Sequence, residues 1–322
     1  MVWFMRAAIA AAVASFASTA LAQSYPAKAI RLVVAFPPGG ATDIIARVVG
    51  QPLSVRLGQP VVVDNRPGSN GNIAGDIVAK SPADGYTLLL GSDSYFGINP
   101  HLYPRMSIDP AKAFAPIATL VANQLVLVVN PALMPVDDFP SFVGLAKRAN
   151  PALAYGSIGN GSQHHLAMEM LKLAGGFKFT HVPYKGGAPA ANAVIGGEVA
   201  AMFGGGSVVS LVKGGKMRAL AVTGPKRSYV LPDLPRIGEF YHGYEINIWQ
   251  GLFAPAGTPP AVLAKLRTEV NEALKLPEIG ERLMPAGAGE PYITTLEEFN
   301  DLMRRDYEKY GKVIKEIGLT VD

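Results

Sequence analysis

The residues FPPGGATD, at positions 36–43, have the composition of a loop that binds an anion. Two prolines end the mainly apolar run before them, because proline cannot donate a hydrogen bond to a neighbouring strand. Two glycines then let another group approach the backbone closely. Thr42 or Asp43 is placed to cap the helical pattern that follows, and the first N–H groups of a helix attract anions. The candidate contacts are Phe36, Gly39, Gly40, Ala41, Thr42 and Asp43. An ordinary connection between a strand and a helix explains the same residues equally well.

A second loop with the same plan follows about 120 residues later, in the sequence SIGNGSQH at positions 157–164. Its serine, asparagine and glutamine side chains are hydrogen-bond donors, and its glycines leave the backbone amides accessible. Such a loop can hold a carboxylate without a formal positive charge, through helix N–H groups and hydrogen bonds. The candidate contacts are Ser157, Gly159, Asn160, Gly161, Ser162, Gln163 and His164.

Three further side chains are candidates because of the element that precedes them. Ser92 ends the apolar run at 86–92, and Asp93 and Tyr95 follow it. Ligands of open parallel sheets gather beyond the carboxyl ends of the strands. Asp93 is suited to an amino group or a hydroxyl of a ligand, and equally to a solvated loop. Trp249 is expected to line a cleft, with core packing as the alternative.

Catalytic and metal chemistry are weakly indicated. Ser162 with His164 or His165 and Asp43 would supply the residue types of a hydrolase triad, but the G-x-S-x-G sequence is missing. His165 and Glu169 have metal-ligand spacing on a helix, and no third ligand is evident. We therefore predict no catalytic residue, no metal site and no cofactor.

The elements that carry these residues alternate between strands and helices. Short apolar runs at 30–36, 60–65, 86–92, 125–130 and 152–158 predict buried strands, and amphipathic segments lie between them. Thr258 before Pro259, and Thr294 with Glu297, predict two later helix starts. The alternation predicts an α/β fold of mainly parallel sheets flanked by helices, and the repeated loop plan suggests one copy per domain.

Composition indicates an exported protein. The first 22 residues combine one arginine, a run of small apolar residues and the sequence Ala-Leu-Ala, which predicts a signal peptide cleaved after Ala22. Without Arg6 the chain has 28 basic and 25 acidic residues in scattered positions, which argues against nucleic acid as a partner. The absence of cysteine excludes disulfides and a lipid-anchored cysteine, and it suits the bacterial periplasm.

Several motifs together resemble the tripartite tricarboxylate transporter substrate-binding receptors, the Bug family of periplasmic solute receptors. They run in order through nearly the whole chain: YPAKAIRLVVAFPPGGATD, VVVDNRPGSNGNIAGDIVAKSPADGYTLLLGS, LAYGSIGNGSQHHLAMEML, HVPYKGGAPAANAVIGGEVAAMF, GKMRALAVTG and WQGLFAPAGTP.

The resemblance implies a two-domain Venus-flytrap fold joined by crossing strands. Domain 1 would hold residues 23–123 and 247–322, and domain 2 would hold 124–246. It also implies that a small carboxylate sits between the two glycine loops, and that a membrane permease is the partner of a monomeric receptor. A sensory receptor that presents its ligand to a signalling protein is the alternative, and a serine-dependent hydrolase is a more remote one.

Two features depart from the pattern of the family. Asp93 is acidic where small neutral residues are common, and the stretch FGGGSVV at 203–209, which includes Gly204, is unusually rich in glycine. Both are expected at the far end of the ligand, so the identity of the carboxylate stays open.

Overall fold

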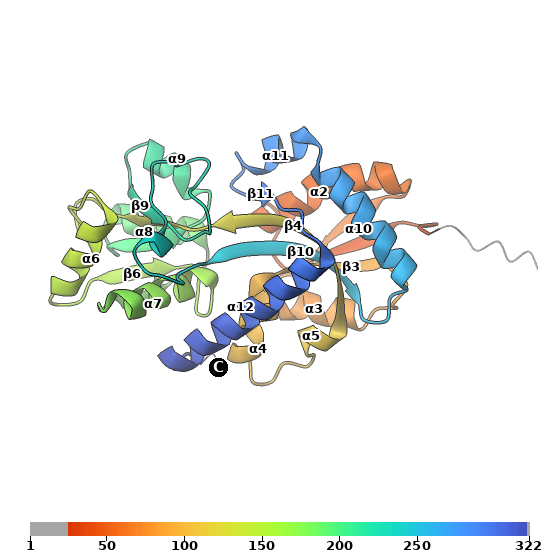
Figure 1. The fold of residues 1–322 in the computed structure, drawn as a ribbon, viewed down its shortest axis with the longest axis horizontal. Helices are drawn as coiled ribbons and strands as arrows, with labels where there is room; N and C mark the ends of the chain where they lie inside the picture. Colours follow the sequence, from red (N-terminus) through yellow and green to blue (C-terminus); the bar gives the residue numbers. More distant parts are fainter. Residues whose placement is uncertain (1–24, 321–322) are drawn as a thin grey trace, which may run out of the picture.

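The computed structural model describes residues 25–320, and the expected signal peptide and its cleavage point lie outside them. Two lobes lie side by side, and each is built on one sheet (Figure 1). The sheet of the first lobe has the order β11-β4-β10-β3-β1-β2. Its strands are β1 (Ile30–Val34), β2 (Val61–Asn65), β3 (Thr87–Ser92), β4 (Phe114–Gln124), β10 (Asn247–Pro255) and β11 (Glu290–Pro291).

The sheet of the second lobe has the order β7-β6-β8-β5-β9. Its strands are β5 (Val126–Val129), β6 (Ala154–Ser157), β7 (Thr180–Pro183), β8 (Ala201–Gly204) and β9 (Arg218–Val222). The helices of this lobe are α6 (Phe139–Arg148), α7 (Gln163–Gly175), α8 (Gly187–Gly196) and α9 (Val208–Lys213), with a 3₁₀ turn η3 (Ile237–Glu239).

Two segments cross between the lobes and explain why the sheets are mixed. β4 leads through Leu125 directly into β5, and β10 returns the chain to the first lobe (Figure 1). β1 pairs in parallel with β2 and β3, and β6 with β7 and β8. β10 and β5 enter from the other lobe and pair antiparallel with both of their neighbours. The expectation of mainly parallel sheets therefore holds for β1, β2 and β3 and for β6, β7 and β8, and not for the strands that cross between the lobes.

Helices cover the first sheet and close one side of the junction. They are α2 (Ala41–Leu57), α3 (Asn72–Ala79), α4 (Asn99–Leu102), α5 (Pro110–Ala113), α10 (Pro260–Leu274), α11 (Pro277–Leu283) and α12 (Leu296–Ile317), with short turns η1 (Ser69–Gly71) and η2 (Ser94–Ile98). Among residues 25–320, no helix is both long and apolar enough to cross a bilayer.

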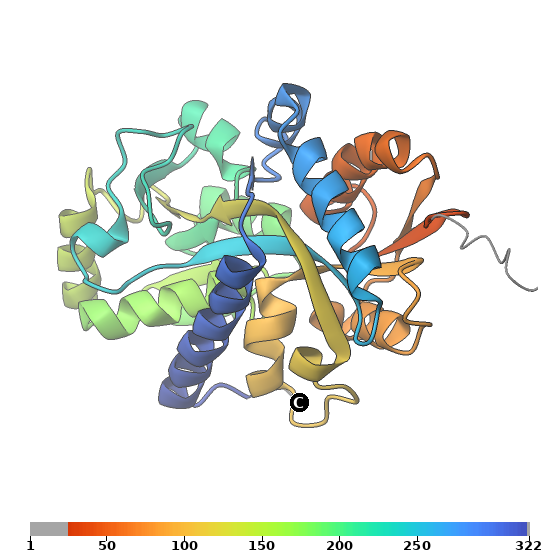
Figure 2. The same cartoon turned by 45° about the vertical axis from the view of Figure 1, so that its right-hand side comes forward.

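A hydrophobic cluster joins the lobes where α12 and α4 meet α7 (Figure 2). Leu166 of α7 is fully buried among Ile98, Leu102, Tyr310 and Ile314, which belong to the first lobe. Burying one leucine side chain stabilises a structure by about 1.5–3 kcal/mol. This contact therefore contributes to the relative position of the two lobes.

Several helix starts differ by one or two residues from those expected. α2 begins after Gly40, so Thr42 and Asp43 lie inside its first turn. α10 begins at Pro260, and the hydroxyl of Thr258 donates to Pro255 O instead. The capping box of α12 uses Thr295 and Glu298, because the hydroxyl of Thr294 is paired with that of Thr119.

Candidate functional site

The first glycine loop, residues 36–43, is braced by a carboxylate. Asp43 Oδ2 accepts hydrogen bonds from Gly39 N at 3.0 Å and from Arg47 Nε at 2.9 Å, and Asp43 Oδ1 accepts one from Asn65 Nδ2 at 3.1 Å. The bond from Arg47, together with those from Gly39 and Asn65, holds the pKa of the Asp43 carboxyl near 2 despite its burial. The ionised Asp43 carboxylate therefore stabilises the loop. It accepts the hydrogen bond of the Gly39 amide, which was expected to donate to a ligand.

The backbone amides of this loop that have no hydrogen-bond acceptor directly follow Gly39 in the sequence. Among residues 25–320, no acceptor takes the N–H groups of Gly40, Ala41 or Thr42, which stand at the start of α2. Gly40 and Ala41 are exposed, as are Pro37 and Pro38 before them. These three amides form an open helix terminus, and such termini attract anions.

The Gln250 side chain of β10 also contacts the start of α2. Gln250 Nε2 donates to the hydroxyl of Thr42 at 3.1 Å, and the buried Oε1 of Gln250 has no partner among the described residues. Gln250 is paired across the sheet with Ser92, whose hydroxyl lies 2.8 Å from that of Ser94. Thr42, Gln250 and Ser92 therefore form a row of neighbouring polar residues beside the loop.

The second glycine loop, residues 157–164, is held by its own side chains. Ser157 Oγ donates to Gly159 O and accepts from Gly159 N, both at 3.1 Å, and lies 2.7 Å from His181 Nε2. Ser162 caps α7 by accepting from His165 N at 3.2 Å, and its hydroxyl donates to Gly159 O at 2.7 Å. The serines thus fix the shape of the loop, and because both hydroxyls donate to Gly159 O, neither is left to donate to a bound anion.

Two stacked imidazoles lie beneath this loop. His165 and His181 have ring centroids 3.8 Å apart and nearly parallel planes, and His165 Nδ1 accepts from Gly161 N at 3.1 Å. Burial, then the charges of His181 and Lys172, lower the pKa of His165 to about 3, so its ring is neutral and keeps this acceptor. The amide of Gly161, like that of Gly159, is therefore used inside the protein.

The second loop has other backbone N–H groups that do not donate within the protein. The N–H groups of Asn160, Gln163 and His164 have no acceptor among residues 25–320, and the Asn160 side chain is exposed. His164 Nδ1 is buried without a partner, and burial lowers the pKa of this imidazole to about 4. Together they form a second helix terminus with neutral donors.

Asp93 connects the two lobes. Its carboxylate is fully buried and accepts hydrogen bonds from Gln163 Nε2 of the second lobe at 2.8 Å and from the hydroxyl of Tyr310 on α12 at 3.2 Å. Burial, and next the charge of Asp306, raise the pKa of Asp93 to about 7. The alternative of a solvated loop acid is wrong, because Asp93 is buried between the lobes immediately before η2, while its contact with a ligand stays a prediction.

Three other candidates also lie in packed positions. Trp249 is fully buried beside Phe96 and Phe299, and its indole N–H donates to Asp306 Oδ2 at 2.7 Å, so the expected cleft position is wrong. Tyr95 packs in the same core, with its hydroxyl lacking a partner among the described residues. Gly204 is buried, and a Cβ there would meet the Val208 side chain at 2.3 Å.

The residues of the imagined triad are not brought together. Among residues 25–320, Ser162 Oγ makes no hydrogen bond to an imidazole ring. Asp43 belongs to the other lobe, where it accepts a hydrogen bond from Arg47. Ser157 does pair with His181, but Ser157 is fully buried within the loop. His165 Nε2 lies 3.8 Å from Glu169 Oε1, and no group of three or more metal-ligating side chains occurs in the described chain.

Sequence reasoning missed the supporting role of four residues that shape the site. Asn65 and Gln250 reach the first loop from β2 and β10, and His165 and His181 support the second loop. Asn65 ends a predicted strand beside the first loop, so its position at the carboxyl edge was the available signal. Gln250 and His181 depend on pairings with residues far along the chain, whereas His165 lies only four residues from Gly161, its partner in the loop.

Known proteins are similar to this chain over most of its length. A family model described as tripartite tricarboxylate transporter family receptor matches residues 45–319. BugT from Bordetella pertussis is 36% identical over 310 residues, covering 95% of this chain and 94% of BugT.

Two solved structures with ligands are also similar to this chain. An R. palustris protein solved with adipate is 34% identical with a TM-score of 0.80, over 92% of this chain and 100% of that one. MatC from Rhodopseudomonas palustris, with bound malate, is 27% identical with a TM-score of 0.75, over 90% and 100%. These similarities confirm the two-lobed α/β fold class.

Proposed function

Because the chain belongs to the tripartite tricarboxylate transporter family of receptors, we propose that it binds a small organic carboxylate between its two glycine loops. The observation that carries this proposal is the pair of open helix termini. The first loop offers the amides of Gly40, Ala41 and Thr42, and the second offers those of Asn160, Gln163 and His164. Neither loop adds a free cation, so recognition relies on oriented N–H groups.

The magnitude of such an interaction is sufficient for a receptor. One helix terminus stabilises an anion by about 0.3–1 kcal/mol, and by up to about 2 kcal/mol when partly buried. A hydrogen bond to a charged group contributes about 1.5–3 kcal/mol. Two termini and a few such bonds approach the roughly 8 kcal/mol of a micromolar complex. The relatives solved with adipate and malate hold dicarboxylates, which places this class first among the candidates.

Binding would draw the lobes together, as hinge closure does in other two-lobed receptors. The proposed domains are residues 23–123 with 247–322, and residues 124–246, so that the crossing strands form the hinge. We further propose that the chain is exported to the periplasm, loses its signal peptide at about Ala22, and delivers its ligand to a membrane permease as a monomer.

A thermal-shift panel on ligand-stripped protein tests this function. Adipate, malate, other aliphatic dicarboxylates, aromatic acids and amino acids are compared. A ligand at one hundred times its dissociation constant adds about 2.7 kcal/mol, which shifts the unfolding midpoint of a protein of this size by a few degrees. A flat response to every carboxylate from folded protein would overturn the proposal.

A glycine variant then locates the site. Gly40 has φ −80°, and the nearest atom to a Cβ there is Pro37 O at 3.5 Å, so Gly40→Val fits the backbone but crowds the open amides. We expect this variant to lose the shift caused by the best ligand. Gly196→Val, at the exposed end of α8 with no neighbour within 4 Å of its Cβ, is the matched control and should retain it.

A further inference from the structure

A groove lies between the lobes and is lined by residues outside both glycine loops. Its volume is about 820 Å³, within the range of small-molecule sites. The second lobe contributes a wall from the start of α9 and from residues 225–230, the first lobe contributes residues 284–292, and β4 and β10 contribute Asn123, Gln124 and Asn247. α9 and α11 face each other here (Figure 1), at the β9 and β11 edges of the sheets. No residue of 36–43 or 157–164 lines it.

The groove carries an excess of positive charge. Lys213 and Lys226 are exposed in its wall, and neither has an ion-pair or hydrogen-bond partner among residues 25–320. Arg227 beside them is paired with Glu239 at 2.9 Å. Glu290 is the one carboxylate among the described lining residues. An anion would therefore meet two uncommitted ammonium groups.

The walls also present apolar surface. Tyr229 is 74% exposed and Val230 is 40% exposed, although both are large side chains. Met284 and Tyr292 lie in the opposite wall. Aromatic faces and lysines in one groove suit a molecule with an apolar body and an acidic group.

A backbone contact between the lobes closes part of this groove. Gly206 of the glycine-rich stretch lies against Gly287, and a Cβ on Gly206 would be 2.5 Å from Gly287 Cα. Both residues line the groove, so its width depends on the relative position of the lobes. The unusual glycines at 204–206 thus have a structural reason on this side of the molecule, in addition to the packing of Gly204 against Val208.

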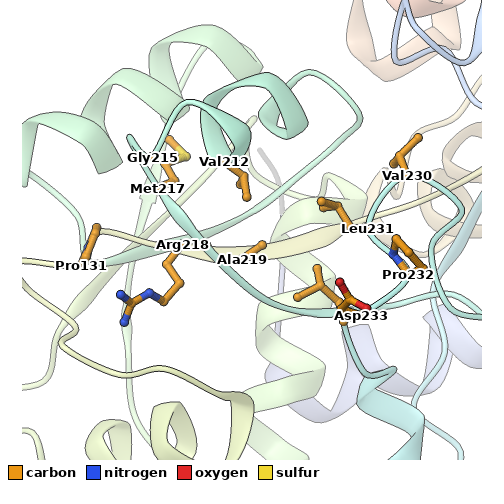
Figure 3. A pocket seen from close by; sticks show the side chains of 11 residues that line it. Pro131, Val212, Gly215, Met217, Arg218, Ala219, Val230, Leu231, Pro232 and Asp233 are labelled. Atoms are coloured by element: carbon orange, nitrogen blue, oxygen red, sulfur yellow. The ribbon is translucent and has the colours of Figure 1, made fainter.

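Another pocket, on the second lobe, is less suited to an anion. It has a volume of about 470 Å³ and lies on the second lobe, where Val212, Val230 and Leu231 line it (Figure 3). Its basic residue, Arg218, donates to Val136 O at 2.7 Å and pairs with Asp137. Asp233 adds a negative charge to its lining.

We propose that the groove between α9 and residues 284–292 is a second binding site, which takes an organic acid with an aromatic body. The ring stacks against Tyr229, and the acid group is held by Lys213 and Lys226. Because both lobes form the walls, occupancy stabilises the arrangement of the lobes in which Gly206 touches Gly287. This site is separate from the carboxylate site of the glycine loops.

Titration with 2-naphthoate, followed by its fluorescence, tests the proposal on the mature protein. We expect saturable binding, weakened at least about tenfold by the double variant Lys213→Glu with Lys226→Glu. Lys147→Glu with Lys216→Glu makes the same change of charge at exposed lysines outside the groove, and it should leave the affinity within about twofold. Tyr229→Ala should weaken binding, whereas Tyr229→Phe retains the ring and the affinity.

Gly40→Val separates this site from the glycine loops. The second site predicts that Gly40→Val leaves 2-naphthoate binding intact, even if it abolishes the response to dicarboxylates. Failure of the dicarboxylate panel would leave this result unaffected. The proposal is overturned if 2-naphthoate does not saturate into the millimolar range, if both lysine pairs have equal effects, or if Gly40→Val alone abolishes binding.

Discussion

At the scale of single residues, His165 supports the loop of the proposed site through a bond to the backbone. Its Nδ1 accepts the Gly161 N–H, and this bond fixes the turn from which Asn160, Gln163 and His164 present their own amides. A protonated ring would lose that acceptor. The low pKa of His165, caused first by burial, keeps the ring neutral under ordinary conditions.

Two amide variants of His165 separate acceptor geometry from packing. Asparagine places its Oδ1 near the position of Nδ1, whereas glutamine places its oxygen near that of Nε2, and both remove the stack on His181. We expect His165→Asn to keep the affinity for the best carboxylate within a few-fold and His165→Gln to lose about tenfold or more. Isothermal titration measures both. Equal affinities for the two variants would show that the bond to Gly161 does not position the loop.

At the scale of elements, α7 has two tasks, because its first turn faces the site and its side packs on the other lobe. Leu166 is fully buried in the cluster with α4 and α12, while Leu173 on the same helix is 45% exposed. The packing of α7 against α12 therefore helps to fix where the second glycine loop lies relative to the first lobe.

Leucine truncation on α7 measures this contact. We expect Leu166→Ala to lower the free energy of unfolding by about 2–5 kcal/mol, because it leaves a cavity between the lobes. Leu173→Ala, the matched exposed position, should change it by no more than about 0.5 kcal/mol. Denaturant titration gives both values. If the two variants are equally stable, the interlobe cluster contributes little to the folded state.

The strands before the loops were predictable, and the helix starts and strand directions were less so. β1, β2, β3, β5 and β6 lie within the apolar runs that predicted them, because buried strands select β-branched and leucine residues over short lengths. Helix starts shifted where a hydroxyl found another acceptor, as at Thr258 and Thr294. The antiparallel direction of β5 and β10 was not predictable, because alternation of elements says nothing of a strand that arrives from the other lobe.

At the scale of the whole molecule, the site depends on contacts between distant parts of the chain. Gln250 lies 208 residues from Thr42, and Asp93 lies 70 residues from Gln163. The sequence motifs located both glycine loops, but not which of their amides are already bonded. The charge of Asp93 marked it as unusual in the sequence. Its burial between the lobes was not predictable, because burial depends on how distant segments pack in the folded molecule.

The charge of Asp93 makes stability depend on pH. Its pKa is about 7 in the folded protein against an ordinary value of 3.8, so between these pH values the folded state binds more protons than the unfolded state. The contribution of Asp93 to the free energy of unfolding is therefore full below about pH 4 and is lost as the pH rises to about 7. His164 and His165 act in the opposite direction, because burial lowers their pKa values to about 4 and about 3.

Comparison of Asp93→Asn with the unchanged protein removes the histidine contributions, which both proteins share. Asparagine imitates the neutral acid and can still accept from Gln163. We expect Asp93→Asn to gain stability relative to the unchanged protein from about pH 4 to about pH 7, by at least about 1 kcal/mol, and no more above that range.

Thermal unfolding across this pH range measures the difference, and Asp64→Asn is the control of opposite sign. Despite partial burial, Arg31 and Arg66 hold the pKa of Asp64 below its ordinary value, so its ionised form stabilises the fold. Asp64→Asn should therefore lose stability relative to the unchanged protein as the pH rises through the ordinary range of a carboxyl. A constant difference for Asp93→Asn would mean that the carboxyl between the lobes is ionised at every pH tested, which contradicts a raised pKa for this group.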